Sequence, residues 1–219
     1  MISCHQVSKA YTTNNNTVVI YDKLDRSVKS GDIVAIMGPS GSGKSTLLNL
    51  ISGLDVPDKG FVKVGETNIS ALSEDDRTRW RSQNIGFIFQ QFYLVPNLTI
   101  EDNIELVIDI TKNKRRFTTD EILQKVGLGG YNKRYPHQLS GGEQQRVAIA
   151  RSFVADLPIL LADEPTGNLD STNTVTIMDL MISLQKESNT TIIIITHNPQ
   201  VASYCNTKYT LQNGKLLVQ

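Results

Sequence analysis

A glycine-rich segment at residues 38–45, GPSGSGKS, constrains this chain more than any other feature. It fits the pattern G-x-x-x-x-G-K-[ST], and it lies between an apolar run at 33–37 and a helix-favouring run at 46–51. Strand, glycine loop and helix, in that order, are the setting that this pattern requires. Glycines let the loop curl so that its backbone N–H groups point inward, and the N-terminus of the following helix adds partial positive charge. The segment therefore predicts a loop that binds phosphate groups.

The residues of this loop have different predicted roles. Lys44 is expected to reach the β- and γ-phosphates of a nucleoside triphosphate. Ser45 is expected to offer its hydroxyl to Mg²⁺, a cation that prefers oxygen ligands and keeps several waters. The predicted phosphate-binding residues are Gly38, Ser40, Gly41, Ser42, Gly43, Lys44, Ser45 and Thr46.

Composition narrows the kind of protein. The 219 residues include 22 Lys and Arg and 22 Asp and Glu, so the formal net charge is +0, which argues against a nucleic-acid binder that relies on overall positive charge. Cys4 and Cys205 lie far apart without metal-binding spacing, so we expect reduced thiols in the cytosol. The first residues lack the pattern of a secretory signal, and the longest apolar run, 192–195, falls far short of the ~20 residues of a membrane helix. Any membrane role is expected to go through a partner.

The hydrophobic pattern predicts an α/β fold. Continuous apolar runs at 159–162 and 190–195 alternate with amphipathic stretches at 143–155 and 171–186, as in a parallel sheet covered by helices on both faces. Short β-prone pieces over residues 1–36 predict an antiparallel β layer. That layer includes a hairpin tip at 12–16. The runs at 60–65 and 85–89 are predicted to be further strands, and the acidic segment at 73–76 is predicted to begin a helix between them.

A helical pattern replaces this alternation between residues 91 and 139. Thr99 and Thr118 begin capping boxes that are followed by helical apolar spacing. We therefore predict a P-loop NTPase core over 1–90 and 140–219, with a small helical subdomain inserted at 91–139. The basic cluster at 112–116 is expected to be a solvated loop, with contact to a phospholipid or an acidic partner as the alternative.

Two carboxylates follow the apolar run at 159–162. In an open parallel sheet, ligands bind beyond the carboxyl ends of the strands, so Asp163 and Glu164 are expected near the phosphates. Asp163 is predicted to hold Mg²⁺ through a water, and Glu164 to polarise the water that attacks the γ-phosphorus. Alone, the acidic pair could merely end a strand; together with the glycine loop it indicates a hydrolytic site.

Polar side chains follow two other predicted strands. His197 is expected to hydrogen-bond the γ-phosphate, whereas His5 and His137 are expected to be structural or surface residues. The amide oxygen of Gln90 is predicted to contact Mg²⁺ or the attacking water. Gln91 is the adjacent alternative, because only the phase of the strand separates the two.

A second glycine motif, LSGGE at 139–143, precedes an amphipathic stretch. The hydroxyl of Ser140, the N–H groups of Gly141 and Gly142 and the dipole of the helix predict another anion-binding site there. An ordinary helix cap is the alternative. Because the chain already has one phosphate-binding loop, this motif suggests that two copies close around the nucleotide.

Together these motifs resemble the ATP-binding subunit of ABC transporters. The resemblance covers essentially the whole chain and rests on GPSGSGKST at 38–46, Gln90, LSGGEQQR at 139–146, ILLADEPTGNLD at 159–170 and His197. In that family two subunits pair head to tail, and each ATP lies between the glycine loop of one and the LSGGE segment of the other. The resemblance implies an ATPase that takes ATP and Mg²⁺ and forms a homodimer on ATP binding. It further implies that Tyr11 stacks on adenine, that Ser140, Gly141, Gly142 and Glu143 bind ATP in the partner copy, and that Asp170 communicates across the dimer.

The resemblance also implies a membrane partner and no nucleic acid. An integral membrane subunit is expected to dock near residues 90–103 and to hold the chain at the cytoplasmic face of the membrane. The residues at 53–55, 85–90 and 165–170 look most like those of the branch that serves macrolide and peptide export, lipoprotein release and cell division. One alternative is a soluble ABC-type ATPase that acts on a non-membrane partner, although no second ATPase half or coiled-coil arm is evident. Another is a catalytically dead interaction module, which the presence of Lys44 and Glu164 disfavours.

Overall fold

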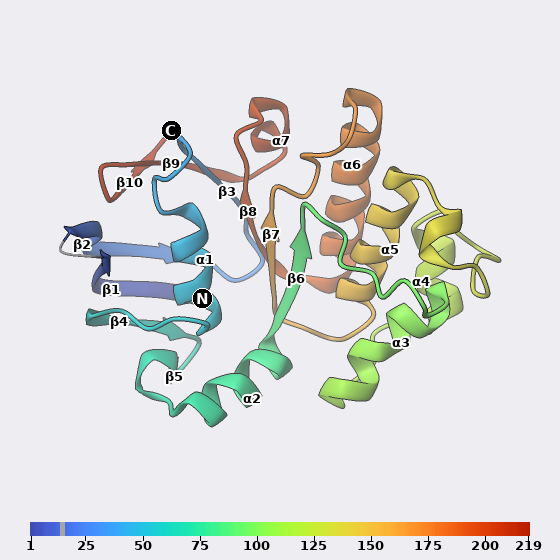
Figure 1. Ribbon diagram of the computed structural model, residues 1–219, viewed down its shortest axis with the longest axis horizontal. Coiled ribbons are helices and arrows are strands. Elements are labelled where there is room, and N and C mark those ends of the chain that lie inside the picture. Colours follow the sequence, from blue (N-terminus) through green and yellow to red (C-terminus); the bar gives the residue numbers. More distant parts are fainter. Residues whose placement is uncertain (14–15) are drawn as a thin grey trace. The chain divides into compact units, whose positions relative to one another are not determined.

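The computed structural model describes residues 1–13 and 16–219 in two compact units (Figure 1). Unit 1 comprises residues 1–82 and 191–219, and unit 2 comprises residues 83–190. Part of the predicted hairpin tip, residues 14 and 15, lies outside the described residues.

Unit 1 contains an antiparallel sheet with the strand order β2-β1-β4-β5. Its strands are β1 (Ile2–Thr13), β2 (Asn16–Val28), β4 (Lys59–Val64) and β5 (Thr67–Asn68). The predicted antiparallel layer is thus confirmed, but β1 and β2 are long strands rather than short pieces separated by turns. Register shifts between Cys4 and Ala10 explain the difference, because bulges bend a strand without ending it.

The other strands of unit 1 follow the order β10-β9-β3-β8. They are β3 (Ile33–Met37), β8 (Thr191–Ile195), β9 (Thr207–Gln212) and β10 (Lys215–Val218). β3 runs parallel to both β8 and β9, while β10 pairs antiparallel with β9. Every residue of β8 is buried, as its continuous apolar sequence predicted.

The helices of unit 1 include α1, which follows the glycine loop. Their bounds are α1 (Lys44–Ser52), η1 (Ile69–Ala71), α2 (Glu74–Asn84), which extends across the boundary between the units, and α7 (Pro199–Ser203). The helix α1 begins two residues before the predicted start, because the left-handed Gly43 (φ 103°) turns the loop directly into the helix. Around one small internal space, Cys4 of β1, Ile36 of β3 and Leu47 of α1 meet in the core.

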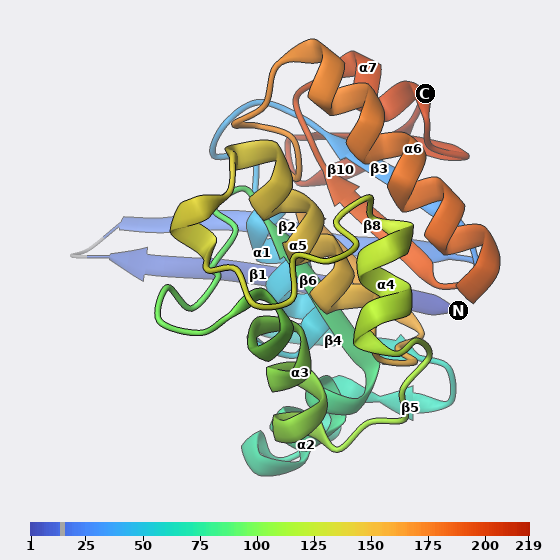
Figure 2. The same cartoon turned by 90° about the vertical axis from the view of Figure 1, so that its right-hand side faces the viewer.

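Unit 2 contains two parallel strands and several helices (Figure 2). Its elements are β6 (Ile85–Phe89), α3 (Ile100–Thr111), α4 (Thr119–Lys125), η2 (Pro136–Gln138), α5 (Gly141–Phe153), β7 (Ile159–Asp163) and α6 (Ser171–Ser188). The helix α5 packs against α3, α4 and α6, and Figure 2 shows it in gold beside α3 and α4. Together with β3, β8 and β9 of unit 1, the β6–β7 pair confirms the predicted parallel strands.

Both predicted capping boxes are present. The Oγ1 atoms of Thr99 and Thr118 accept hydrogen bonds from the N–H groups of Asp102 and Glu121, at 3.1 and 3.2 Å. The predicted division into a core and an insertion does not coincide with the two units, since α3 and α4 share unit 2 with α5, β7 and α6. A separate subdomain at 91–139 stays a prediction.

The basic cluster at 112–116 connects α3 to α4, and its arginines form ion pairs within unit 2. Arg115 binds both carboxylate oxygens of Glu105, one of them at 2.7 Å, and Arg116 pairs with Asp156. Arg115 also forms an isolated β-bridge with Ala155. The cluster is therefore not only a solvated loop, because its arginines bind the α3–α4 connection to the α5–β7 connection.

Candidate active site

The glycine loop of unit 1 can be built only with glycine at two of its positions. Gly38 and Gly43 have φ values of 150° and 103°, which other residues rarely adopt. A Cβ atom at position 38 would lie 2.6 Å from the carbonyl oxygen of Leu211, and one at position 43 would lie 2.5 Å from Ile20. The loop is thus enclosed by strands β2 and β9.

Lys44 folds back over this loop. Its Nζ donates to the carbonyl oxygens of Gly38 and Pro39, each at 2.8 Å. An ammonium group is a compact positive charge with three donors, so in this position it suits a bound anion. The structure places Lys44 where the motif predicted a phosphate-binding cation, although its role stays a prediction.

Tyr21 supports the glycine loop through a hydrogen bond, and the sequence did not predict this role. Its ring is fully buried, and its hydroxyl donates to the carbonyl oxygen of Gly43 at 2.6 Å. The same oxygen accepts from the N–H of Leu47 at 3.0 Å, in the first turn of α1. Burial raises the pKa of the Tyr21 hydroxyl. Nothing in the sequence of β2 distinguishes this tyrosine from any other core aromatic residue.

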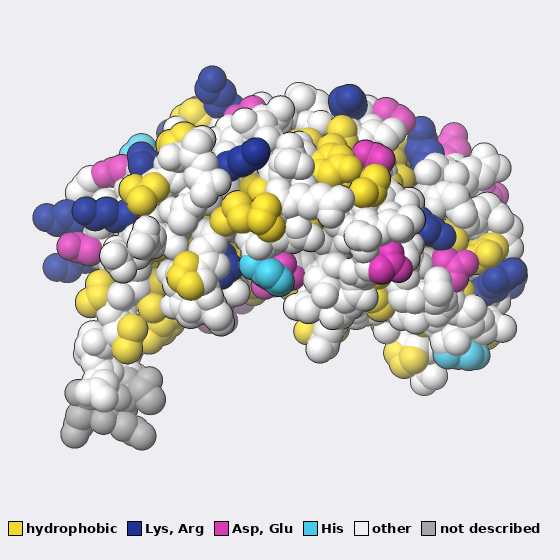
Figure 3. Space-filling model, turned by 90° about the horizontal axis from the view of Figure 1, so that it is seen from above, with side chains coloured by type: hydrophobic (Ala, Val, Ile, Leu, Met, Phe, Trp, Pro, Cys, Tyr) yellow, Lys and Arg dark blue, Asp and Glu magenta, His cyan; other side chains and the backbone are white. Residues whose placement is uncertain are grey.

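Tyr11, the predicted adenine-stacking residue, lies on the hairpin of β1 and β2. Tyr11 is 40% exposed, and Val18, directly opposite on β2, is 57% exposed. Figure 3 shows hydrophobic side chains along this hairpin, next to the grey residues. An exposed aromatic ring beside an apolar side chain is suited to stacking on a planar base.

His197 follows β8 at the sheet edge where the glycine loop follows β3. Ile36 pairs with Ile195 in the parallel register, and the N–H of Thr196 donates to the carbonyl oxygen of Ile36 at 3.2 Å. Unit 1 therefore brings the loop and His197 to the same edge, as the sequence predicted. The other two histidines lie on the surface, where His5 stacks on Phe61.

Unit 2 holds the two predicted carboxylates. Asp163 is the last residue of β7, and Glu164 follows with a φ of 47°, a left-handed conformation that is uncommon for any residue except glycine. The N–H of Gly167 donates to the carbonyl oxygen of Glu164 at 3.0 Å and closes the turn. Strained backbone of this kind is concentrated at active sites, where the surroundings fix it.

Gln90 lies beside this turn. Phe89 pairs with Asp163, so Gln90 and Glu164 each follow the end of one of two neighbouring strands. The Nε2 of Gln90 donates to Asn168 Oδ1 at 3.0 Å, and Asn168 Nδ2 donates back to the carbonyl oxygen of Gln90 at 3.0 Å. These bonds involve Gln90, the residue that the sequence analysis preferred to Gln91.

Two residues that fix the same turn were not predicted. Asn168 binds Gln90 on both its side chain and its backbone. Gln145 of α5 is fully buried, and its Nε2 donates to the carbonyl oxygen of Pro165. The turn after β7 is thereby connected to α5, the helix that follows the second glycine motif.

The second glycine motif forms the start of α5. Ser140 is the N-cap, and its N–H and hydroxyl donate to Glu143 Oε2 at 2.8 and 2.7 Å. These hydrogen bonds from Ser140 hold the pKa of Glu143 below its ordinary value. The helix begins at Gly141, two residues before the predicted start. The capping role that we considered as the alternative is therefore present, and it leaves open the anion-binding role of the helix N-terminus.

Asp170 is the N-cap of α6. Its Oδ1 accepts from the N–H of Asn173 and its Oδ2 from the Asn173 side chain, both at 2.8 Å. The backbone hydrogen bond from Asn173 lowers the pKa of Asp170. This local role accounts for the carboxylate within one chain, and communication across a dimer stays a prediction.

The predicted Mg²⁺ ligands are all oxygen donors. Ser45 belongs to unit 1, and Gln90 and Asp163 belong to unit 2. Hydroxyl, amide and carboxylate oxygens suit this hard cation, which binds to few protein groups and keeps several waters. The chemistry of each donor therefore fits Mg²⁺, and their joint binding of the ion stays a prediction.

The α/β fold with parallel strands contains a strand, a glycine loop and a helix in succession, and carboxylates at the end of another strand. These features define the class of P-loop nucleoside triphosphatases. A family model for the ABC transporter matches residues 21–167. The chain belongs to this family as an ATP-binding subunit with ATPase activity.

Relatives across nearly the whole chain place it within the family. The ABC transporter ATP-binding protein YtrE of Bacillus subtilis is 40% identical, over 99% of this chain and 96% of the relative. The lipoprotein-releasing system ATP-binding proteins LolD of Alcanivorax borkumensis and Cytophaga hutchinsonii are 39% and 42% identical, over 99% and 92% of this chain and 96% and 93% of the relatives. These names agree with the predicted branch. In the part of the chain that the structure describes, no helix is both long and apolar enough to cross a membrane.

A solved structure supports the same placement. It is the dimeric structure of a post-hydrolysis state of the ATP-binding cassette MJ0796 bound to ADP and Pi. It matches with a TM-score of 0.88 and 36% identity, over 100% of this chain and 98% of that one. The predicted α/β fold is therefore confirmed.

Proposed function

We propose that this ATPase subunit drives a separate integral membrane protein through ATP-dependent dimerisation. The observation that carries the proposal is the full-length similarity, at a TM-score of 0.88, to a cassette described as dimeric in a post-hydrolysis state with ADP and Pi. The relatives named for lipoprotein release support a membrane partner that uses the energy for export or for mechanical transmission. In this proposal the subunit lies at the cytoplasmic face of the membrane, held there by its partner.

The residues of one chain divide the work of ATP hydrolysis. Tyr11 stacks on the adenine, and the loop at 38–46 binds the phosphates. Glu164 polarises the attacking water, and His197 contacts the γ-phosphate. Mg²⁺, bound by Ser45, Gln90 and Asp163, would neutralise charge on the phosphates.

The second glycine motif binds the nucleotide of the other copy. Ser140 and Gly141 are exposed at the N-terminus of α5, a helix of 13 residues, so their polar groups can face an anion outside the chain. Hydrogen bonds to a charged γ-phosphate are about twice as strong as neutral ones, and ADP lacks that phosphate. We therefore expect ATP to hold two copies together and ADP to release them.

The membrane partner docks on the loop after Gln90. Tyr93 and Val95 are 62% and 37% exposed, and exposed apolar side chains of this kind support a docking surface here. Arg151, on the last turn of α5, donates to the carbonyl oxygen of Tyr93 at 2.7 Å and to that of Phe92 at 3.0 Å. The docking loop is thus bonded to the helix that begins at the second glycine motif.

The test uses Glu164→Gln. This variant should keep its affinity for ATP while hydrolysis falls by about 10²-fold or more, the usual effect of losing a general base. Analytical ultracentrifugation should show a dimer with MgATP and a monomer with MgADP. A Glu164→Gln variant that hydrolyses ATP at the wild-type rate would contradict the catalytic role.

A second substitution tests the action of Ser140 on the other copy. Ser140→Asp and Ser140→Asn both keep a good N-cap for α5, but only aspartate adds a negative charge facing the phosphate. In the Glu164→Gln background, Ser140→Asp should be monomeric with MgATP, and Ser140→Asn should dimerise more readily than Ser140→Asp. If the aspartate variant dimerises as strongly as its asparagine control, the second motif does not bind the partner's nucleotide.

Copurification tests the membrane partner. Detergent-solubilised native membranes should yield a stoichiometric integral membrane protein, and replacing Tyr93 and Val95 with serine should remove it without changing basal ATPase activity. Recovery of ribosomes or DNA instead would favour the soluble alternative.

A further inference from the structure

We propose that Asp55 and Lys9 are positioning residues for the nucleotide base, because they hold the ring of Tyr11 in one orientation. The inference rests on the proposed stacking of Tyr11 on adenine and adds two residues to that site. All three residues belong to unit 1.

Asp55 is fixed to the end of α1. The helix ends at the left-handed Gly53, and the N–H groups of Leu54 and Asp55 both donate to the carbonyl oxygen of Asn49, at 2.9 and 3.1 Å. From this position Asp55 Oδ2 accepts a hydrogen bond from the Tyr11 hydroxyl at 2.8 Å. The ring is therefore attached to the same helix that begins at the phosphate-binding loop.

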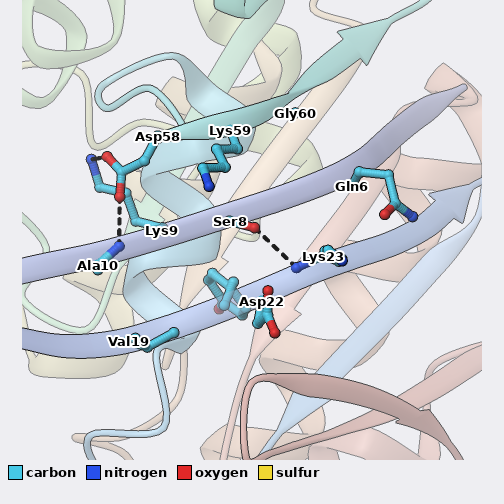
Figure 4. A pocket seen from close by; sticks show the side chains of 11 residues that line it. Gln6, Ser8, Lys9, Ala10, Val19, Asp22, Lys23, Asp58, Lys59 and Gly60 are labelled. Atoms are coloured by element: carbon cyan, nitrogen blue, oxygen red, sulfur yellow. Dashed lines mark hydrogen bonds and ion pairs between the residues drawn. The ribbon is translucent and has the colours of Figure 1, made fainter.

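Lys9 completes the arrangement from β1. It is buried, and its Nζ donates to Asp55 Oδ1 at 2.7 Å and to the carbonyl oxygen of Val56 at 2.9 Å. Asp58 lies 3.7 Å from the same Nζ and accepts from the N–H of Ala10 at 2.7 Å (Figure 4). Asp55, the carbonyl oxygen of Val56 and Asp58 therefore hold in place a side chain that is normally among the most flexible.

Electrostatics agrees with this geometry. Burial alone would raise the pKa of Asp55, but the hydrogen bonds from Lys9, Tyr11 and the Val56 N–H hold it below its ordinary value. The carboxylate is thus ionised when it binds both partners, and hydrogen bonds to an ionised group are the stronger kind.

The ammonium of Lys9 also covers one face of the ring. Its Nζ lies over Tyr11, 5.2 Å from the ring centroid, within the range of a cation–π contact. A planar base can therefore stack only on the opposite face. Since the hydroxyl and one face of Tyr11 are already fixed, ATP binding does not need to immobilise a free aromatic side chain.

The expected effect follows from that immobilisation. Ordering one side chain on binding costs about 0.5–1.5 kcal/mol, which corresponds to about a 2- to 10-fold change in affinity. Lys9→Met and Asp55→Asn should each weaken MgATP binding by this factor. Neither should change the affinity for inorganic tripolyphosphate, which has the phosphates but no base.

Calorimetric titration of the full chain with MgATP and with magnesium tripolyphosphate makes the comparison. Lys63→Met is the matched control, because it removes an exposed ion pair with Glu66 on the same antiparallel sheet. It should leave both affinities unchanged. In a Tyr11→Leu background, Asp55→Asn should have no further effect on ATP, because residues that act through one another are not additive.

The results separate the two proposals. If Tyr11→Leu leaves the ratio of the two affinities unchanged, Tyr11 does not stack on the base, and both ideas fail. If Tyr11→Leu lowers the ATP affinity but Asp55→Asn and Lys9→Met do not, or if they weaken tripolyphosphate equally, the positioning role is wrong and the stacking role stands.

Discussion

Replacing Tyr21 with phenylalanine tests whether a buried hydroxyl supports the phosphate-binding loop. The hydroxyl donates to the carbonyl oxygen of Gly43 at 2.6 Å, and that oxygen also accepts from the N–H of Leu47 at 3.0 Å. The substitution therefore removes one hydrogen bond without leaving a buried carbonyl unpaired. Phenylalanine keeps the ring, so no large cavity forms.

The magnitude follows from this count. One net hydrogen bond contributes about 1 kcal/mol, whereas an unpaired buried group would cost about 1–3 kcal/mol. We expect the free energy of unfolding of Tyr21→Phe to fall by about 1 kcal/mol, and Tm to fall by about 2–4 °C for a chain of this size. Because Gly43 directly precedes Lys44, the affinity for ATP should also fall, by up to about fivefold if the full 1 kcal/mol is lost from the bound state.

Urea unfolding and calorimetric titration with MgATP measure the two effects. Tyr209→Phe is the matched control, since Tyr209 is a buried tyrosine of β9 in the same unit. A Tyr21→Phe variant that unfolds at the wild-type urea concentration would show that the hydroxyl does not stabilise the loop. A loss well above 3 kcal/mol would show that Gly43 has no second partner, which would also refute the reasoning.

Two further predictions concern the docking loop and acid stability. Asn103 is fully buried and makes four hydrogen bonds to residues 95–99. Asn103→Leu should therefore lower the free energy of unfolding, measured in urea titrations, by about 3 kcal/mol. A loss below about 0.5 kcal/mol would show that these hydrogen bonds do not stabilise the loop. The pKa of Asp55 lies below its ordinary value of 3.8, so its stabilising contribution is present above about pH 4 and is lost as the pH falls through the lower, folded-state pKa. The difference in stability between wild type and Asp55→Asn should therefore shrink below pH 4 and stay constant from pH 5 to 8. A difference that grows in acid would contradict the assignment.

Features that depend on neighbouring residues could be predicted from the sequence. The strand over 85–89 has the predicted bounds, and the capping boxes at Thr99 and Thr118 are present, because each is decided within a few residues. The sheet edge shared by the glycine loop and His197 was predictable for a related reason. Parallel strands end at the same edge, so residues that directly follow them must lie there.

The supporting contacts could not be predicted, since each joins residues far apart in the chain. Tyr21 bonds to Gly43 across 22 positions, and Tyr11 bonds to Asp55 across 44. Tyrosine in a strand and aspartate after a helix are common, and a single sequence does not say which pairs meet. The length of β1 and β2 was missed for a different reason, because bulges interrupt the alternation of side chains without interrupting the strand.

The start of α5 shows how one residue can satisfy two interpretations that the sequence presents as alternatives. Ser140 Oγ accepts from the N–H of Glu143 at 3.4 Å and donates its own hydrogen to Glu143 Oε2 at 2.7 Å. Only the second bond must be given up for the hydroxyl to donate to a phosphate oxygen. The cap would remain, because Glu143 Oε2 still accepts from the N–H of Ser140 at 2.8 Å. The ATP-binding role of Glu143 stays a prediction, and we expect it to act through Ser140, since a carboxylate beside the γ-phosphate would repel it.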